Sequence, residues 1–138
     1  MSKPPKNAME ISLELRLSDQ DLKGSINEAQ IMTLAEEARI RAMYQLKRLM
    51  DDEESLGSVM RTCNIDFHRQ VMDPDNVTAK VWISHIGKTS YIVQHDLNQN
   101  GQSLATMEAV MVLYSTERQA PTTISGDLRA AFKTISSN

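Results

Sequence analysis

Five segments of the chain are predicted to be β-strands, and the clearest sign is an alternation of hydrophobic and polar residues with a period of two. In the first segment, residues 11–17, every second position is Ile or Leu. The last segment is apolar on both faces, which predicts an interior strand or one that pairs with another subunit. An Asn-Gly pair at residues 100–101 predicts a hairpin turn before this last strand. The four later strands are expected at 60–72, 77–86, 90–97 and 103–114.

A long helix is predicted between the first strand and the second. Residues 26–50 contain no Gly or Pro and are rich in strong helix formers, and Asn27 is a suitable N-cap. Met32, Met43 and Met50 widen the apolar surface, so we expect a central helix with more than one buried side. One apolar stripe has spacings of three and four and small residues in its middle: Ile31, Ala35, Ala38, Ala42, Leu46 and Leu49.

The order of these elements is one strand, a long helix and then strands joined by hairpins, which predicts an α+β fold. An antiparallel sheet of about five strands would wrap around the long helix. The chain has 138 residues, which fits a single domain over residues 1–138. We expect a flexible N-terminus at 1–10 and a C-terminal helix and tail at 125–138, with the helix at 127–135.

Charge and cysteine content narrow the classes of function. The net charge of −3 provides no general attraction to nucleic acid or to an anionic membrane. The single cysteine, Cys63, cannot form an internal disulfide, which favours the cytoplasm. The first ten residues lack the apolar core of a signal peptide, and no segment approaches the roughly 18 apolar residues of a membrane span. We therefore expect a cytoplasmic protein that binds neither nucleic acid nor membrane.

Common catalytic and metal-binding motifs are missing from the sequence. Cys63, His68, His85 and His95 lack the close spacing of zinc ligands, so no metal site is predicted. No Gly-x-Ser-x-Gly elbow supports a serine nucleophile. No phosphate-binding loop is present either, and no cofactor is expected.

The loop before the long helix and the helix itself carry a family resemblance. Residues 18–27 are SDQDLKGSIN and residues 36–39 are EEAR. This pattern resembles hotdog-fold acyl-CoA thioesterases of the 4-hydroxybenzoyl-CoA type, in which D-x-D-x-x-G-H-[VI]-N is followed by E-E-A-R. Weaker matches at 67–71, 75–77 and 86–90 extend the resemblance from about residue 11 to residue 115. It implies a hotdog fold, an acyl-CoA or acyl-carrier-protein thioester as substrate, and a homodimer or homotetramer.

Two positions depart from the family pattern. The histidine that usually follows the glycine is Ser25, and an aromatic residue often found one turn into the helix is Ile31. The essential carboxylate is kept, since the family's catalytic acid corresponds to Asp21. These departures leave open a module that binds acyl thioesters without hydrolysing them. A further alternative is a structural protein that uses the helix and the last strand only for oligomerisation. A dehydratase is disfavoured, because the histidine motif of hotdog dehydratases is missing.

Thioester hydrolysis needs a group that activates water and donors aimed at the oxygen that becomes negative. Asp21 lies just before the helix and is the candidate general base or nucleophile. The free N–H groups near Asn27 and Glu28 would polarise the carbonyl. The alternative is that Asp19 or Asp21 only supports a turn through an Asx-type hydrogen bond.

Glu36 is the second catalytic candidate, because some members of the resembled family use a helix glutamate as the acid. The alternative is an ion pair between Glu36 and Arg39 or Arg41. Gly87, Lys88, Thr89 and Ser90 resemble the place where family members hold the CoA phosphates, often at a subunit boundary. Taken alone, Gly87-Lys88 is a hairpin tip with a solvated lysine.

Overall fold

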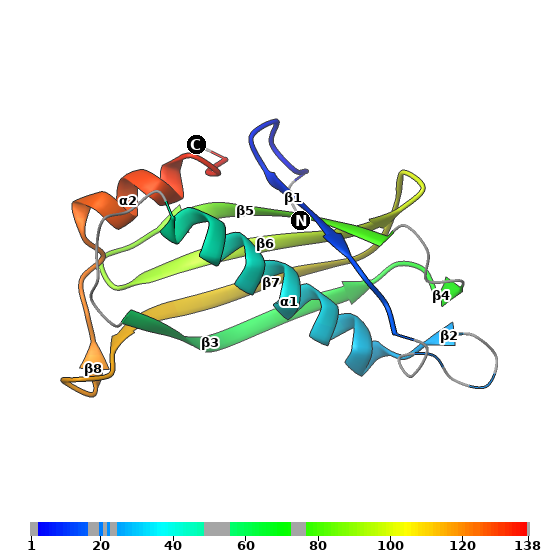
Figure 1. Ribbon diagram of the computed structural model, residues 1–138, viewed down its shortest axis with the longest axis horizontal. Coiled ribbons are helices and arrows are strands. Elements are labelled where there is room, and N and C mark those ends of the chain that lie inside the picture. Colours follow the sequence, from blue (N-terminus) through cyan, green and yellow to red (C-terminus); the bar gives the residue numbers. More distant parts are fainter. Residues whose placement is uncertain are drawn as a thin grey trace.

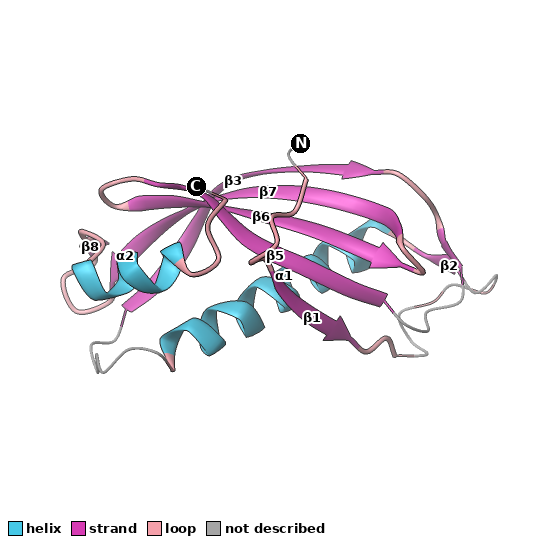
Figure 2. Ribbon diagram, turned by 90° about the horizontal axis from the view of Figure 1, so that it is seen from above, coloured by secondary structure: helices cyan, strands magenta, loops and turns pink. Residues whose placement is uncertain are grey.

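One long helix crosses one face of a curved antiparallel sheet (Figures 1 and 2). The computed structural model describes residues 3–16, 20, 22, 25–48, 56–72 and 77–137. Every pair of neighbouring strands is antiparallel, and β8 (Ala120–Pro121) adds a short pairing to β7. This arrangement confirms the α+β, hotdog architecture predicted from the sequence. The main sheet has the order β1 (Met9–Leu13), β5 (Val77–Ile86), β6 (Ser90–Gln99), β7 (Gln102–Ser115) and β3 (Leu56–Phe67).

The long helix, α1, spans Glu28–Lys47 and begins at the predicted cap. The Asn27 side chain accepts a hydrogen bond from the Gln30 backbone N–H at 3.0 Å. Leu49, Met50 and the acidic run at 51–54 lie outside the described residues. The predicted stripe packs against the sheet, and its three alanines, Ala35, Ala38 and Ala42, are 0% exposed.

The opposite side of α1 is open in the single chain. Met32 is 39% exposed, Ile40 is 44% exposed and Tyr44 is 64% exposed. The expectation of more than one buried side is therefore wrong for one subunit, because the sheet covers only the alanine stripe. The helix therefore has one face buried against the sheet and one exposed face with apolar residues.

Strand boundaries differ from the prediction where tertiary pairing decides them. Strand β1 begins at Met9, so two residues of the expected flexible N-terminus belong to the sheet. The single strand expected at 60–72 is wrong, since the Leu104 carbonyl binds the N–H groups of His68 and Arg69 and the chain leaves β3 there. The next strand, β4 (Val71–Met72), pairs instead with β2 (Ser25–Ile26) next to the start of α1.

The C-terminal helix, α2 (Gly126–Lys133), lies near the C-terminal end of α1, whereas β2 and β4 lie near its N-terminal end (Figure 1). Ser125 caps α2 by accepting a hydrogen bond from the Leu128 N–H at 3.1 Å. Phe132 packs on Tyr91 of β6 with ring centroids 4.6 Å apart. Among the described residues, no helix has the length and apolar character needed to cross a membrane.

Candidate functional site

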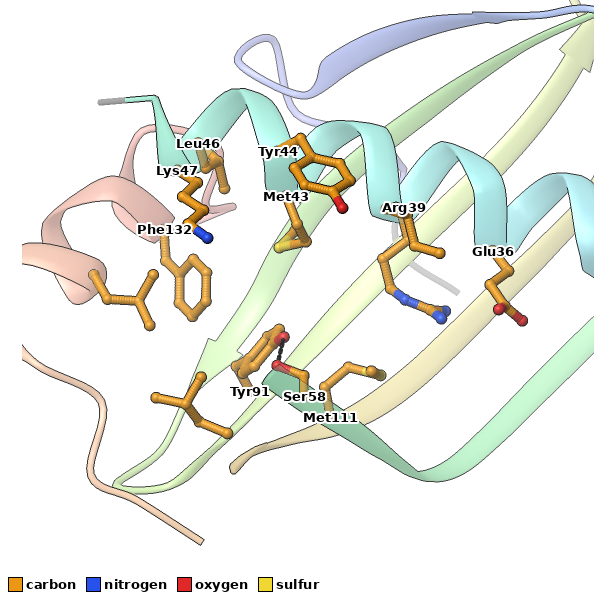
Figure 3. Close-up of a pocket in the computed structure, with 13 residues that line it drawn as sticks. Glu36, Arg39, Met43, Tyr44, Leu46, Lys47, Ser58, Tyr91, Met111 and Phe132 are labelled. Carbon is orange, nitrogen blue, oxygen red and sulfur yellow. Dashed lines mark hydrogen bonds between the residues drawn. The ribbon is translucent and has the colours of Figure 1, made fainter. Parts of the chain in front are cut away.

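A cavity of about 420 Å³ lies between α1, the sheet and α2 (Figure 3). Most of its walls are aliphatic or aromatic, with a few polar groups among them. This is the usual composition of a small-molecule pocket, in which apolar walls hold the ligand and polar groups orient it. The lining residues are Glu36, Arg39, Ile40, Met43, Tyr44, Leu46, Lys47, Ser58, Tyr91, Met111, Leu113, Leu128 and Phe132.

The periodicity of each element places these side chains around one space. Arg39 and Met43 are four residues apart on α1, so both extend from the same helix face toward the strands (Figure 3). Met111 and Leu113 alternate along β7 and are buried on the face that α1 covers. Phe132 of α2 closes the end of the cavity near the C-terminus of α1.

Arg39 is the buried cation of the cavity. It is 6% exposed, and no described residue forms a hydrogen bond with its Nη1 atom. Burial lowers the pKa of its guanidinium, and the Glu36 carboxylate nearby raises it. The guanidinium remains protonated at neutral pH, because no protein environment removes its proton. The cavity wall therefore contains a positive charge without a close counterion in the described part of the chain.

A pair of hydroxyl groups faces the same space. The Tyr91 phenol and the Ser58 hydroxyl are 2.6 Å apart and share a hydrogen bond, drawn as a dashed line in Figure 3. Burial raises the pKa of the Tyr91 phenol, while the hydrogen bond to Ser58 lowers it. With a raised pKa, the phenol keeps its proton at neutral pH and can donate a hydrogen bond.

Glu36 borders the cavity near Arg39 (Figure 3). Its carboxylate is exposed, and it forms no hydrogen bond or ion pair with Arg39 or Arg41 in the described structure. Arg41 instead binds Glu37, with Nη2 2.9 Å from Oε1. The ion pair considered as an alternative role for Glu36 is therefore not formed in a single subunit, and its carboxylate remains available to a ligand.

The start of α1 holds two of the other sequence candidates. Asn27 and Glu28 are exposed, and the first backbone N–H groups of any α-helix lack acceptors within the helix. Pairing between β2 and β4 fixes the chain just before this point. The residue chosen as catalytic base, Asp21, lies outside the described residues, as do Asp19 and Gly24.

Hydrogen bonds fix the loop at residues 87–90, which lies toward the C-terminal end of α1. The Gly87 N–H donates to the Ser90 carbonyl at 2.7 Å, and the Gly87 carbonyl accepts from Arg129 Nη2 of α2 at 2.8 Å. A Cβ at residue 87 would lie 3.1 Å from the Ser90 carbonyl oxygen, so this tight turn favours glycine. At the tip of the loop, Lys88 is exposed and Thr89 is half-buried.

The candidate residues that the structure describes do not form one cluster within a single chain. Residues 87–90 are bound to α2, whereas Asn27 and Glu28 lie beside β2. A helix of 20 residues is about 30 Å long, and α1 separates the two groups along its length. Within one subunit, Glu36 is the only described candidate that borders the cavity.

The histidines and the cysteine form no metal-binding cluster in the described part of the chain. His68 forms a hydrogen bond with Thr106 Oγ1 at 3.0 Å, and His95 Nδ1 forms one with the Met107 carbonyl at 3.0 Å. No group of three or more His, Cys, Asp or Glu side chains comes together among the described residues.

Sequence reasoning missed three polar residues of the cavity, Arg39, Tyr91 and Ser58, although the sequence contains a signal for the first two. Arg39 is four residues after Ala35 and three before Ala42, so helical spacing places it on the buried stripe. Tyr91 begins an alternation that continues through Val93 on the covered face of β6. The location of Ser58 depends on β3 starting at Leu56, which local sequence did not predict.

Comparisons with known proteins agree with this architecture. The family model described as the thioesterase-like superfamily matches residues 15–132. The structure is similar to a thioesterase from Thermus thermophilus complexed with coenzyme A and Zn, with a TM-score of 0.75, 26% identity, and coverage of 91% of this chain and 92% of that chain. No curated protein sequence matches the chain.

Two more distant solved structures show the same fold. A thioesterase superfamily protein from Jannaschia sp. CCS1 has a TM-score of 0.86 at 17% identity, over 100% of this chain and 99% of that chain. A 1,4-dihydroxy-2-naphthoyl-CoA thioesterase from Synechocystis has a TM-score of 0.73 at 15% identity, over 90% of this chain and 94% of that chain.

Proposed function

Because the chain belongs to the thioesterase-like superfamily, we propose that it hydrolyses an acyl-CoA thioester, or the matching acyl-carrier-protein thioester, to a free acid and a thiol. The observation that supports this most directly is the cavity of about 420 Å³ along α1, with apolar walls and the Glu36 carboxylate at its border. Apolar walls suit an acyl chain, and a carboxylate beside it can activate water. No cofactor is needed for this reaction.

The proposed chemistry uses a carboxylate and the amides at the start of α1. Asp21 acts as general base by taking a proton from water, whose oxygen attacks the thioester carbon, or it attacks that carbon itself as a nucleophile. N–H groups near Asn27 and Glu28 stabilise the negative oxygen of the tetrahedral intermediate. The carbon–sulfur bond then breaks, and the thiolate leaves and takes up a proton. If Asp21 is the nucleophile, this step leaves a mixed anhydride, which water hydrolyses to the free acid and the Asp21 carboxylate. Glu36 is the alternative base because it borders the cavity.

We propose that residues 87–90 bind the CoA phosphates. Lys88 supplies a positive charge, and Thr89 and Ser90 supply hydroxyl donors. The hydrogen bond between Arg129 and the Gly87 carbonyl supports this role because it fixes the loop. The length of α1 separates this loop from Asn27, so a complete site requires a second subunit.

Two subunits are proposed to join at the edge strand β3. It has 12 residues, lies at the end of the sheet and exposes Val59, Met60 and Phe67 by 53%, 37% and 43%. A long apolar edge strand is a site for pairing with another chain. A two-fold axis at this edge reverses the direction of α1 in the second copy. The loop at 87–90 of one subunit would then lie near the start of α1 of the other.

Carboxylate substitutions test the mechanism in a thiol-release assay with acyl-CoA. We expect Asp21→Asn to lower kcat by about 100-fold or more with little change in KM, since the lost group acts in the transition state. Asp19→Asn is the matched control and should retain activity. Full activity of Asp21→Asn would contradict the role of Asp21, and a comparable loss in Glu36→Gln but not in Glu37→Gln would assign the base to Glu36.

We also propose that the protein is cytoplasmic, because its single cysteine cannot form an internal disulfide. The competing function is an acyl-thioester-binding module, favoured by Ser25 and Ile31 at positions where the resembled family has histidine and an aromatic residue. Such a module would bind acyl-CoA in a direct binding measurement and release no thiol.

A further inference from the structure

The cavity contains a buried cation to which no described side chain forms a hydrogen bond or an ion pair. Arg39 is 6% exposed and its Nη1 atom has no hydrogen-bond partner in the described structure. A buried ion loses its hydration, and this is strongly unfavourable unless a partner compensates it. Figure 3 shows the guanidinium extending from α1 into the space above the strands. A buried guanidinium with an unpaired nitrogen at this position therefore indicates a place for an anionic ligand group.

The hydroxyl pair offers a further donor on the same side of the cavity. Tyr91 and Ser58 together have two hydroxyl protons, and the hydrogen bond between them uses one. The other proton remains for a ligand oxygen. Arg39, Tyr91 and Ser58 all line this cavity.

The other charged groups of the cavity lie at its border. Glu36 and Lys47 are both exposed and have opposite charges, so together they add no net charge to the cavity. Arg39 is thus the buried charge that determines what the inner part of the cavity attracts. The remaining inner surface is apolar, with Met43, Met111 and Leu113 beside it.

We propose that the acyl group of the substrate has a second carboxylate at its far end, and that Arg39 binds it. Its methylene chain would lie against the methionines and leucines, while the carboxylate would accept hydrogen bonds from the guanidinium and the Tyr91–Ser58 pair. The substrate class is therefore a dicarboxylic acid joined to CoA or to a carrier protein through one carboxyl group. This inference rests on the proposed thioester hydrolysis for the identity of the substrate but not for binding of the anion.

A binding measurement tests the site without any catalysis. Free adipate or suberate should raise the melting temperature of the full chain, and hexanoate or octanoate at the same concentration should raise it less. Arg39→Met should abolish this difference. Without ligand, the variant should melt at the same or a higher temperature, because methionine fills similar space without a buried charge.

A kinetic measurement tests the same site during turnover. The ratio of kcat/KM for adipyl-CoA to that for hexanoyl-CoA should fall by about tenfold or more in Arg39→Met, mainly through KM for adipyl-CoA. Arg39→Lys keeps the charge without the planar fork and should retain part of the preference. Arg41→Met, which removes an exposed arginine paired with Glu37, is the matched control and should leave the ratio unchanged.

Equal stabilisation by adipate and hexanoate would overturn the inference, whatever the activity. It would also be overturned if Arg39→Met melted at a lower temperature and lost its oligomeric state, since the guanidinium would then be paired with a second copy of the chain. Absence of thiol release from every acyl-CoA, together with stabilisation by adipate that depends on Arg39, would contradict the proposed function and leave the anion site supported.

Discussion

His95 lies fully buried in the sheet, where its Nδ1 atom forms a hydrogen bond with the Met107 carbonyl. The pKa of its imidazole is lowered to about 4, mainly by burial; the hydrogen bond to Met107 opposes this shift and the charge of Arg39 adds to it. The unfolded chain has a histidine pKa of about 6.5. Between these values the unfolded state binds more protons than the folded state, so the free energy of unfolding falls as the pH decreases.

We expect acidification from about pH 6.5 to pH 4 to remove on the order of 3 kcal/mol of stability through this residue. Urea unfolding of the wild type and of His95→Leu across that range measures the effect. The carboxylates titrate in both proteins, so the difference between the two curves isolates His95. The variant should lose less stability on acidification, and parallel curves would show that the imidazole does not titrate as its burial indicates.

Single residues also show where sequence reasoning works and where it does not. Asn27 was correctly predicted as the N-cap of α1, because capping depends on residues within one turn. Arg39 was considered only as a surface ion-pair partner, although its spacing from Ala35 places it on the buried stripe. Long charged side chains are rarely buried, so an exposed position was predicted for Arg39 despite its helical spacing.

At the level of elements, the hairpin between β6 and β7 depends on two residues with positive φ. Asn100 has a φ of 53° and Gly101 has a φ of 79°, which confirms the turn predicted from the Asn-Gly pair. We expect Gly101→Ala to lower the free energy of unfolding by about 1 kcal/mol, because an L side chain strains this conformation.

The matched control for this turn is Gly126→Ala at the start of α2. An added Cβ at residue 126 meets no atom within 4 Å, and its φ is not in the positive range. Chemical denaturation should therefore show unchanged or slightly increased stability for this variant. Equal losses in both variants would show that the backbone conformation of the hairpin is not the cause.

The elements with strong local periodicity were predicted well, and those defined by distant pairing were not. Strand β5 was predicted with its observed bounds, since apolar residues occupy every second position from Val77 to Ile83. Strand β3 starts earlier than predicted because Leu56 pairs with Ser115 of β7, far away in the sequence. The two-residue strands β2 and β4 pair with each other and have too few residues to show a pattern.

At the scale of the whole molecule, the exposed apolar face of α1 and the free edge of β3 lie beside the cavity. Phe67 belongs to this edge and does not line the cavity, so it reports on assembly rather than on ligand contact. We expect Phe67→Lys to shift the protein toward monomer in light scattering, because a lysine on an edge strand opposes pairing. Activity should fall together with the fraction of dimer.

Thr123→Lys introduces the same charge in an exposed loop before α2 and serves as the control for assembly. It should remain oligomeric and active. A Phe67→Lys monomer with full activity would contradict the idea that two subunits complete the site. A wild-type chain that is monomeric at assay concentrations and active would contradict it as well.

Thiol release from a panel of acyl-CoAs is the most direct test of the proposed activity. The panel would include butyryl-, hexanoyl-, octanoyl-, succinyl-, adipyl- and suberyl-CoA, with a colorimetric reagent for the free thiol. We expect release that saturates with substrate and proceeds well above the rate without protein for at least one of these thioesters. Saturable binding of acyl-CoA with no thiol release above that rate would contradict hydrolysis and favour a binding module.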